Sequence, residues 1–191
     1  MQERRRMIEE YEVNPHTMLL FPIKYGSKIY TEVFELSDQF LSPFKPLDIV
    51  KKSCEFFGSS YEGRRQGAKQ LIGSGHKPPI IIDPHTSIFL FPTMSPSKQE
   101  CIWISHEHVV SHERLDTNTT SVMFRNKQTF RLPVSYSVFN SQLLRTALLR
   151  TRLSQRMEEM ERRAHFIYFP MTKTKAAEHV DPYTWSVEKK H

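Results

Sequence analysis

The sequence has little of what secreted, membrane-anchored or disulfide-rich proteins use. Its 191 residues include two cysteines, Cys54 and Cys101, and no Cys-x-x-Cys pair. This usage excludes a disulfide framework and is typical of a reducing compartment. No apolar run approaches the roughly 20 residues that span a bilayer. The early arginines 4–6 are followed by glutamates rather than by the apolar core of a signal peptide. We therefore expect a cytoplasmic protein.

The common catalytic motifs are also missing. There is no Gly-x-Ser-x-Gly, no dinucleotide-binding glycine fingerprint, and the segment 67–70 (GAKQ) lacks the Ser or Thr that follows Gly-Lys in a phosphate-binding loop. These absences predict a protein that is not an enzyme and holds no cofactor.

One enzymatic alternative stays open. If residues 101–112 form a single strand, then His106, His108 and His112 share one face, and His-x-His is a spacing that zinc sites on strands use. Ile102 and Ile104 occupy the same face, which favours ordinary polar histidines over a metalloenzyme. We therefore predict no metal site.

Positive charge is plentiful and unevenly distributed. The formal net charge is +6. Residues 51–77 carry six Lys or Arg against two Glu, residues 125–163 carry nine against three, and the remainder carries twelve against sixteen acidic residues. The whole excess therefore lies in two segments, as expected of a footprint for phosphates. The alternative is an interaction protein whose basic face binds an acidic partner other than DNA.

The hydrophobic patterning predicts an α+β fold. Alternating runs predict strands over residues 17–22, 29–36, 80–83, 88–92, 101–112, 119–124 and 129–132. Apolar residues at helical spacing predict helices over 47–57 and about 137–163, and residues 59–72 form a short helix or a helical turn. Residues 80–83 and 88–92 are apolar on both faces, so we expect both strands to be central in the sheet.

This pattern predicts a single domain over residues 11–170. It would consist mainly of antiparallel β-sheet with an inserted helix and a long C-terminal helix. A mobile charged arm (1–10) would precede it, and a flexible tail (171–191) would follow.

The first candidate binding segment is basic and contains glycine. Tyr61 and His76 could add base stacking there. The alternative without a binding role is a solvated loop whose arginines pair with Glu55 and Glu62. Its phosphate-binding candidates are Arg64, Arg65, Lys69 and Lys77.

The second candidate is a stripe on the long helix. At 100° per residue Arg145, Arg152, Arg156 and Arg163 lie close to one line, which can follow a phosphate backbone. The alternative is surface ion pairing, since Glu159 precedes Arg163 by four residues. The apolar face of this helix is predicted to be core or a dimer seam.

Short strings in a fixed order resemble the ComK competence transcription factors of Gram-positive bacteria. The likeness runs from about residue 11 to residue 170. The strings are residues 45–47 (KPL), 53–61 (SCEFFGSSY), 63–64, 76–80 (HKPPI), 83–84, 88–93 (IFLFPT), 103–106 (WISH), 108–109, 132–136 (LPVSY), 145–147 (RTA) and 149–150.

The resemblance implies a sequence-specific activator of DNA-uptake genes. Such a protein would read paired A-tract and T-tract sites in double-stranded DNA largely through the minor groove, as two dimers, and would act on RNA polymerase, associating with the nucleoid when bound. Charge and position make Arg64, Arg65, Lys69 and Lys77 the first candidates for DNA contacts. The second group comprises Arg145, Arg150, Arg152 and Arg156.

The family is also similar in a short aromatic segment near its C-terminus, which the adaptor MecA recognises for delivery to the Clp protease. Here Phe166, Ile167, Tyr168, Phe169 and Pro170 occupy that place. Phe169 stands where the family has tyrosine, and a methionine follows Pro170 where the family has lysine. The alternative is an edge strand that completes the sheet.

Overall fold

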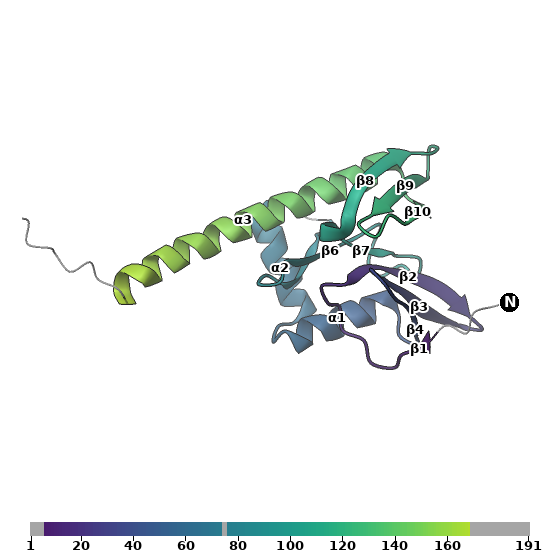
Figure 1. The fold of residues 1–191 in the computed structure, drawn as a ribbon, viewed down its shortest axis with the longest axis horizontal. Coiled ribbons are helices and arrows are strands. Elements are labelled where there is room, and N and C mark those ends of the chain that lie inside the picture. The colour runs from purple at the N-terminus through teal and green to yellow at the C-terminus, as the bar shows by residue number, and fades with distance from the viewer. Residues whose placement is uncertain (1–5, 74–75, 169–191) are drawn as a thin grey trace, which may run out of the picture. The chain divides into compact units, whose positions relative to one another are not determined.

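A seven-stranded mixed sheet forms the centre of the fold (Figure 1). The computed structural model describes residues 6–73 and 76–168. Six of the strands pair antiparallel in the order β4-β3-β2-β7-β6-β5, and β1 joins β4 in parallel at one edge. The strands are β1 (Arg6–Met7), β2 (Thr17–Tyr25), β3 (Lys28–Glu35), β4 (Gln39–Ser42), β5 (Ile80–Asp83), β6 (Ile88–Pro92) and β7 (Trp103–Ser105).

Two helices connect β4 to β5. Helix α1 (Pro46–Phe56) begins with proline at its first position, where the missing N–H is not needed, and ends before Gly58 at a φ of 70°. Helix α2 (Tyr61–Ile72) begins at Ser60, whose hydroxyl accepts the Gly63 N–H, and ends at Gly73 in the left-handed conformation. Both predicted helical segments are confirmed, and the glycines inside α2 do not interrupt it.

A smaller antiparallel sheet follows the large one along the chain. Its order is β10-β9-β8, with β8 (Val109–Arg114), β9 (Thr120–Phe124) and β10 (Thr129–Leu132). The predicted strands of residues 17–22, 29–36, 119–124 and 129–132 are confirmed, and they pair as the antiparallel hairpins β2–β3 and β9–β10.

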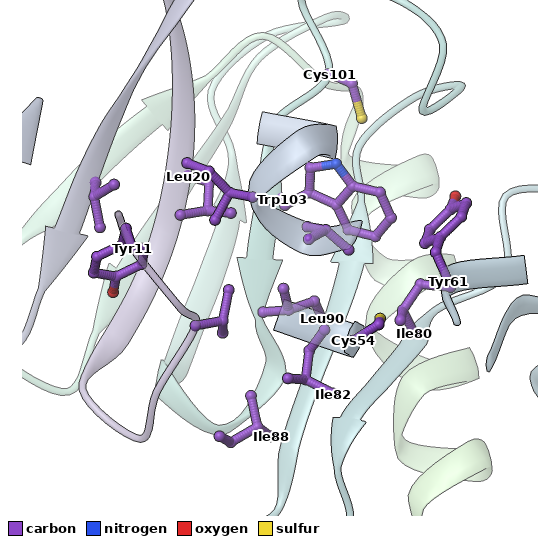
Figure 2. Packing of buried hydrophobic residues seen from close by; sticks show 14 residues of the cluster. Tyr11, Leu20, Cys54, Tyr61, Ile80, Ile82, Ile88, Leu90, Cys101 and Trp103 are labelled. Carbon is purple, nitrogen blue, oxygen red and sulfur yellow. The ribbon is translucent and has the colours of Figure 1, made fainter. Parts of the chain in front are cut away.

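Side chains of the large sheet alternate between two cores, because successive strand residues point to opposite faces. On one face Leu20, Ile80, Leu90 and Trp103 pack against α1. Figure 2 shows the Trp103 indole between Leu20 and Tyr61, with Tyr61 edge-on at a ring-centroid distance of 6.4 Å.

The other face of the large sheet carries the smaller sheet. Leu19, Phe91 and Ile104 pack with Val122 and Phe124. A third cluster joins α2, β5, β6 and helix α3 (Tyr136–Tyr168) through Ala68, Leu71, Ile81, Phe89 and Leu149. Both faces of β6 are therefore buried, as its apolar sequence predicts.

Helix α3 (Tyr136–Tyr168) is longer at both ends than predicted. The described residues up to Gln155 form one structural unit, and a second unit begins at Arg156, within this helix. In the first unit, Phe139, Leu143 and Leu149 attach α3 to the cores. The α+β prediction with a long C-terminal helix is confirmed.

Two strand predictions are wrong. Strand β5 is the outer strand rather than a central one; it is apolar on both faces because helix α2 contributes Tyr61 to the core on one face and Leu71 to the cluster on the other. Residues 101–112 do not form one strand, because the 3-10 turn η1 (His106–His108) separates β7 from β8 and the two belong to different sheets.

Part of the predicted N-terminal arm joins the large sheet. Within the predicted N-terminal arm, β1 pairs with β4 and the Ile8 N–H donates to the Leu41 carbonyl. Residues 1–5 of that arm and the whole predicted tail 171–191 lie outside the described residues.

Candidate functional site

Helix α2 presents its predicted cations in different directions. The Arg65 side chain is 39% exposed and pairs with Glu62 at 3.1 Å, as the ion-pairing alternative for this segment predicted. Arg64 is half-buried, and its Nε is fully buried with no hydrogen-bond partner among the described atoms. Lys69 is half-buried one helical turn after Arg65. Arg65 and Lys69 therefore share the outer side of α2, whereas Arg64 is partly committed to packing.

A groove of about 610 Å³ runs beside the first turns of α2. Its cations come from four separate segments: Lys51 of α1, Arg65 of α2, Lys77 before β5, and Lys98 in the loop before β7. Leu47, Tyr61, Pro78, Met94 and Pro96 supply an apolar lining, and Ser95 and Ser97 supply hydroxyls. We call this the basic groove. Glu62 is the acidic residue among its described lining residues.

A smaller hollow of about 210 Å³ continues the basic groove towards the start of α1. The two share Leu47, Pro96, Ser97 and Lys98. The continuation adds the exposed Lys45, together with one carboxylate, Asp48. The cationic surface is therefore elongated rather than a single spot.

The two basic segments of the sequence meet where α3 crosses the end of α2. The Arg152 guanidinium donates to the Leu71 carbonyl, and Arg145 donates to the His76 carbonyl at 3.4 Å. Gln142 donates to the Lys77 carbonyl at 3.1 Å. Cations near the C-terminus of a helix interact favourably with the helix dipole, and these two arginines lie near the C-terminus of α2. Arg145 and Arg152 thus tie α3 to His76 and to Leu71, and His76 lines the basic groove.

Arg150 points elsewhere and belongs to what we call the Glu107 cluster. Its guanidinium pairs with the Glu107 carboxylate, which also lies 3.6 Å from Arg125 Nη2 and 3.6 Å from His106 Nδ1. The Glu107 side chain is 20% exposed. Arg150 is therefore neutralised locally and does not join Arg145 and Arg152.

The unit that begins at Arg156 holds the rest of the predicted stripe. Arg156 is exposed, and Arg163 pairs with Glu159, as the ion-pairing alternative predicted. Residues 166–168 lie in α3, so the edge-strand alternative is wrong for Phe166, Ile167 and Tyr168. Phe169 and Pro170 of the predicted adaptor segment lie outside the described residues.

Tyr61 does not have the stacking role that its position in the sequence suggested. It is 8% exposed, and burial raises the pKa of its hydroxyl to about 12. Its ring packs on Trp103 rather than facing solvent. His76, by contrast, is exposed and lines the basic groove.

The three histidines of the metal hypothesis do not share a face. His108 Nε2 donates to the Pro15 carbonyl at 2.9 Å, His112 Nε2 lies 3.1 Å from Asn140 Oδ1, and His106 faces Glu107. Burial lowers the pKa of both His106 and His108. Over residues 6–73 and 76–168, no three His, Cys, Asp or Glu side chains are grouped to hold a metal ion. The shared-face prediction is wrong because η1 rotates the chain between β7 and β8.

Both cysteines are core residues. Cys54 and Cys101 are buried and free, and burial raises the pKa of each thiol to about 11. A thiol of this kind is a poor nucleophile at neutral pH. They therefore contribute packing rather than chemistry.

Sequence reasoning missed three cations of the surface. Lys45 and Lys51 lie at the start of α1 and within it, whereas Lys98 lies in the distant loop before β7, and all three line the basic groove or its continuation. Lys51 was inside the basic segment 51–77, which was the available signal. For the other two, the folded arrangement alone gives the grouping.

Comparison with known proteins identifies relatives along most of the chain. The family model described as "ComK protein" matches residues 8–158. The "Competence transcription factor" of Bacillus subtilis (strain 168) is 42% identical over 164 residues, which cover 85% of each chain. No solved structure matches significantly. Among the described helices, none is both long and apolar enough to cross a membrane.

Proposed function

The chain belongs to the ComK family, and from this membership and its basic surface we propose that it is a competence transcription factor. It would bind double-stranded DNA and activate genes for DNA uptake, without catalysing a reaction. The relative from Bacillus subtilis bears that description over 85% of its length. Such a protein would work in the cytoplasm, on the nucleoid, and would contact RNA polymerase when it activates.

The observation that carries the proposal is the meeting of two basic segments. Residues 51–77 and 125–163 are separate in the sequence, yet Arg145 and Arg152 donate to carbonyls of residues 76 and 71. One side of the first unit therefore carries Lys69, Lys77, Arg145 and Arg152. A contiguous cationic surface on rigid elements is what a phosphate backbone requires.

The family resemblance implies recognition of paired A-tracts and T-tracts, and the same residues are compatible with it. A narrow A·T minor groove concentrates negative potential and attracts arginine. Arg65, Arg145 and Arg152 are the guanidinium groups nearest to this surface, and they are half-buried or exposed. Arg150 is a weaker candidate because Glu107 already pairs with it.

Paired sites call for self-association. Leu144 and Leu148 are 61% and 41% exposed and lie one helical turn apart on α3. An apolar pair of this kind fits a seam between two copies, as predicted for this helix. Recognition of residues 166–170 by a MecA-type adaptor remains a proposal based on family resemblance.

A salt-titrated gel shift tests the function. The probe is a duplex with paired A- and T-tracts, and the control duplex has the same composition in scrambled order. We expect tighter binding to the tract duplex and a steep fall in affinity with salt. The double variant Arg65→Ala, Lys69→Ala should weaken binding to the tract duplex, because it removes two cations from the outer side of α2.

Two results would contradict the proposal, and a third would reassign the role of the α2 residues. Equal affinity for both duplexes would remove sequence specificity. Equal affinity for heparin would show general polyanion binding and favour an acidic protein partner instead. A loss of folding in the α2 variant, seen as a thermal midpoint lowered by more than 5 °C, would assign Arg65 and Lys69 a structural role.

A further inference from the structure

We propose that the basic groove and its continuation hold one sugar-phosphate strand of the DNA duplex, with Lys45, Lys51 and Lys98 as phosphate-contacting residues. This inference rests on the proposed function and adds a location. It assigns a second contact surface, made by α1 and the 94–98 loop, to the face on which α2 and α3 present their cations.

The two hollows have more cations than carboxylates in their lining, which makes them complementary to a polyanion. Five cations line the two hollows: Lys45, Lys51, Arg65, Lys77 and Lys98. The carboxylates among the described lining residues are Glu62 and Asp48, and Glu62 is already paired with Arg65. The surface therefore keeps a positive excess that an anion can neutralise. The three lysines outside the sequence-based candidates are exposed.

The shape of the surface favours a strand over an isolated anion. The hollows share four residues and form one track past the start of α1. Each DNA strand carries one negative charge per about 3.4 Å of helix axis, so an elongated row of lysines meets several phosphates. An isolated phosphate needs several donors converging on one point, whereas these cations come from separate segments along the track.

The lining of the groove suits the rest of a nucleotide. Leu47, Pro78, Met94 and Pro96 form apolar walls on which a deoxyribose can pack. The hydroxyls of Ser95 and Ser97 lie 3.0 Å apart at the loop and can donate to phosphate oxygens. Contacts of this kind hold the backbone without reading bases.

Contacts to phosphate and contacts to bases affect DNA binding in different, measurable ways. Loss of a lysine that contacts phosphate weakens binding to all sequences alike and reduces the slope of log K against log salt by about one unit. A residue that reads bases or groove width changes the ratio between cognate and scrambled duplexes instead.

The test compares two double variants of the full chain with the unaltered protein. The groove variant is Lys51→Gln, Lys98→Gln. The control variant is Lys24→Gln, Lys28→Gln, which removes two equally exposed lysines from the tip of the β2–β3 hairpin. Binding of the tract duplex and of its scrambled control is measured across a salt series, and thermal midpoints confirm folding.

We expect the groove variant to lose about two units of salt slope and to bind both duplexes roughly tenfold to sixtyfold more weakly at about 0.1 M salt. The ratio between the two duplexes should stay constant. The control variant should keep the slope of the unaltered protein to within about half a unit.

Other outcomes overturn one proposal or the other. If the unaltered protein does not prefer tract DNA, the proposed function fails. If it does, but the groove variant keeps its salt slope or matches the control, the inference about the groove fails alone. If pyrophosphate binds the groove, detected by calorimetry and lost in the groove variant, while duplex affinity is unchanged, then the groove is a small-anion site and the inference is overturned.

Discussion

The basic groove and the Glu107 cluster both gather cations from distant segments, but they leave them in opposite states. In the basic groove, cations of α1, α2 and two loops line an open surface, and the carboxylates are fewer than the cations. In the Glu107 cluster, Arg125, Arg150 and His106 surround a single carboxylate that is 20% exposed. The first arrangement leaves charge available to a partner, whereas the second uses charge to join η1 to α3 and to the β9–β10 turn.

A count of arginines on a helix therefore does not locate a binding surface. Arg150 and Arg152 are two residues apart on α3, yet one pairs with Glu107 and the other with a backbone carbonyl at the end of α2. Their neighbours decide what each contributes, and neither neighbour is visible in the local sequence.

Charge reversal in the basic groove should give the largest effect. The variant Lys51→Glu, Lys98→Glu loses two phosphate contacts and adds repulsion, so we expect duplex affinity to fall by about a hundredfold or more at about 0.1 M salt. The thermal midpoint should move by less than about 2 °C because both side chains are exposed. Fluorescence anisotropy with labelled duplex measures the change. Retained affinity would show that the cations of the basic groove, like those of the Glu107 cluster, do not contact DNA.

Removing the central carboxylate of the other region should act on stability instead. Glu107→Gln leaves Arg150 and Arg125 without their shared counter-charge, so we expect unfolding to become easier by about 1–2 kcal/mol, or roughly 2–8 °C. Calorimetry measures the midpoint, and Glu113→Gln, at an exposed strand position, is the control. An increase of more than about tenfold in duplex affinity would show that the cluster conceals a DNA-binding surface.

Arg152 combines features of the two regions, since it has both a structural partner and an exposed side chain. Arg152→Ala should cost about 1 kcal/mol of stability, because the Leu71 carbonyl loses its charged donor. Arg152→Lys keeps the charge. If Arg152 also contacts DNA, the lysine variant should recover most of the duplex affinity. If both variants lower stability and neither changes affinity, the residue is structural.

The smallest expected effect is a pH dependence in the Glu107 cluster. Burial lowers the pKa of His106 in the folded protein, so the unfolded chain takes up a proton first as the pH falls. Stability should therefore decline as the pH is lowered from about 7 through the ordinary histidine pKa near 6.5. Thermal midpoints between pH 7.5 and 5.5 measure this, with His106→Asn as the comparison. An equally steep decline in the variant would assign the effect to other groups.

The local parts of the fold were predictable because their signals are local. Alternating side chains over residues 17–22 and 29–36 predicted β2 and β3, and apolar residues at helical spacing over residues 47–57 predicted α1. The break at η1 was not predictable. Residues 101–112 contain no Gly or Pro, and their strand propensity is continuous, so the change of sheet arises from tertiary contacts such as the Arg125 N–H donating to the His108 carbonyl.

The candidate surface was predictable in part for the same reason. Arg65 and Lys77 lie in a basic stretch and line the groove, and two arginines of the α3 stripe adjoin it. Lys98 lies in a polar loop with no basic neighbours in sequence. Its role depends on how β6 and β7 place the loop opposite α1, which no spacing rule encodes.

Helix α2 covers the last strand of the large sheet, and this has a consequence for solubility. Strand β5 pairs with β6 on one side, and Ala68 and Leu71 of α2 pack beside it. A local melting of α2 would uncover Ile81 on β5, whose outer edge pairs with no other strand among the described residues, and the two together form a template for strand addition from another molecule. Substitutions that loosen this helix should therefore produce aggregates before they produce soluble, inactive protein.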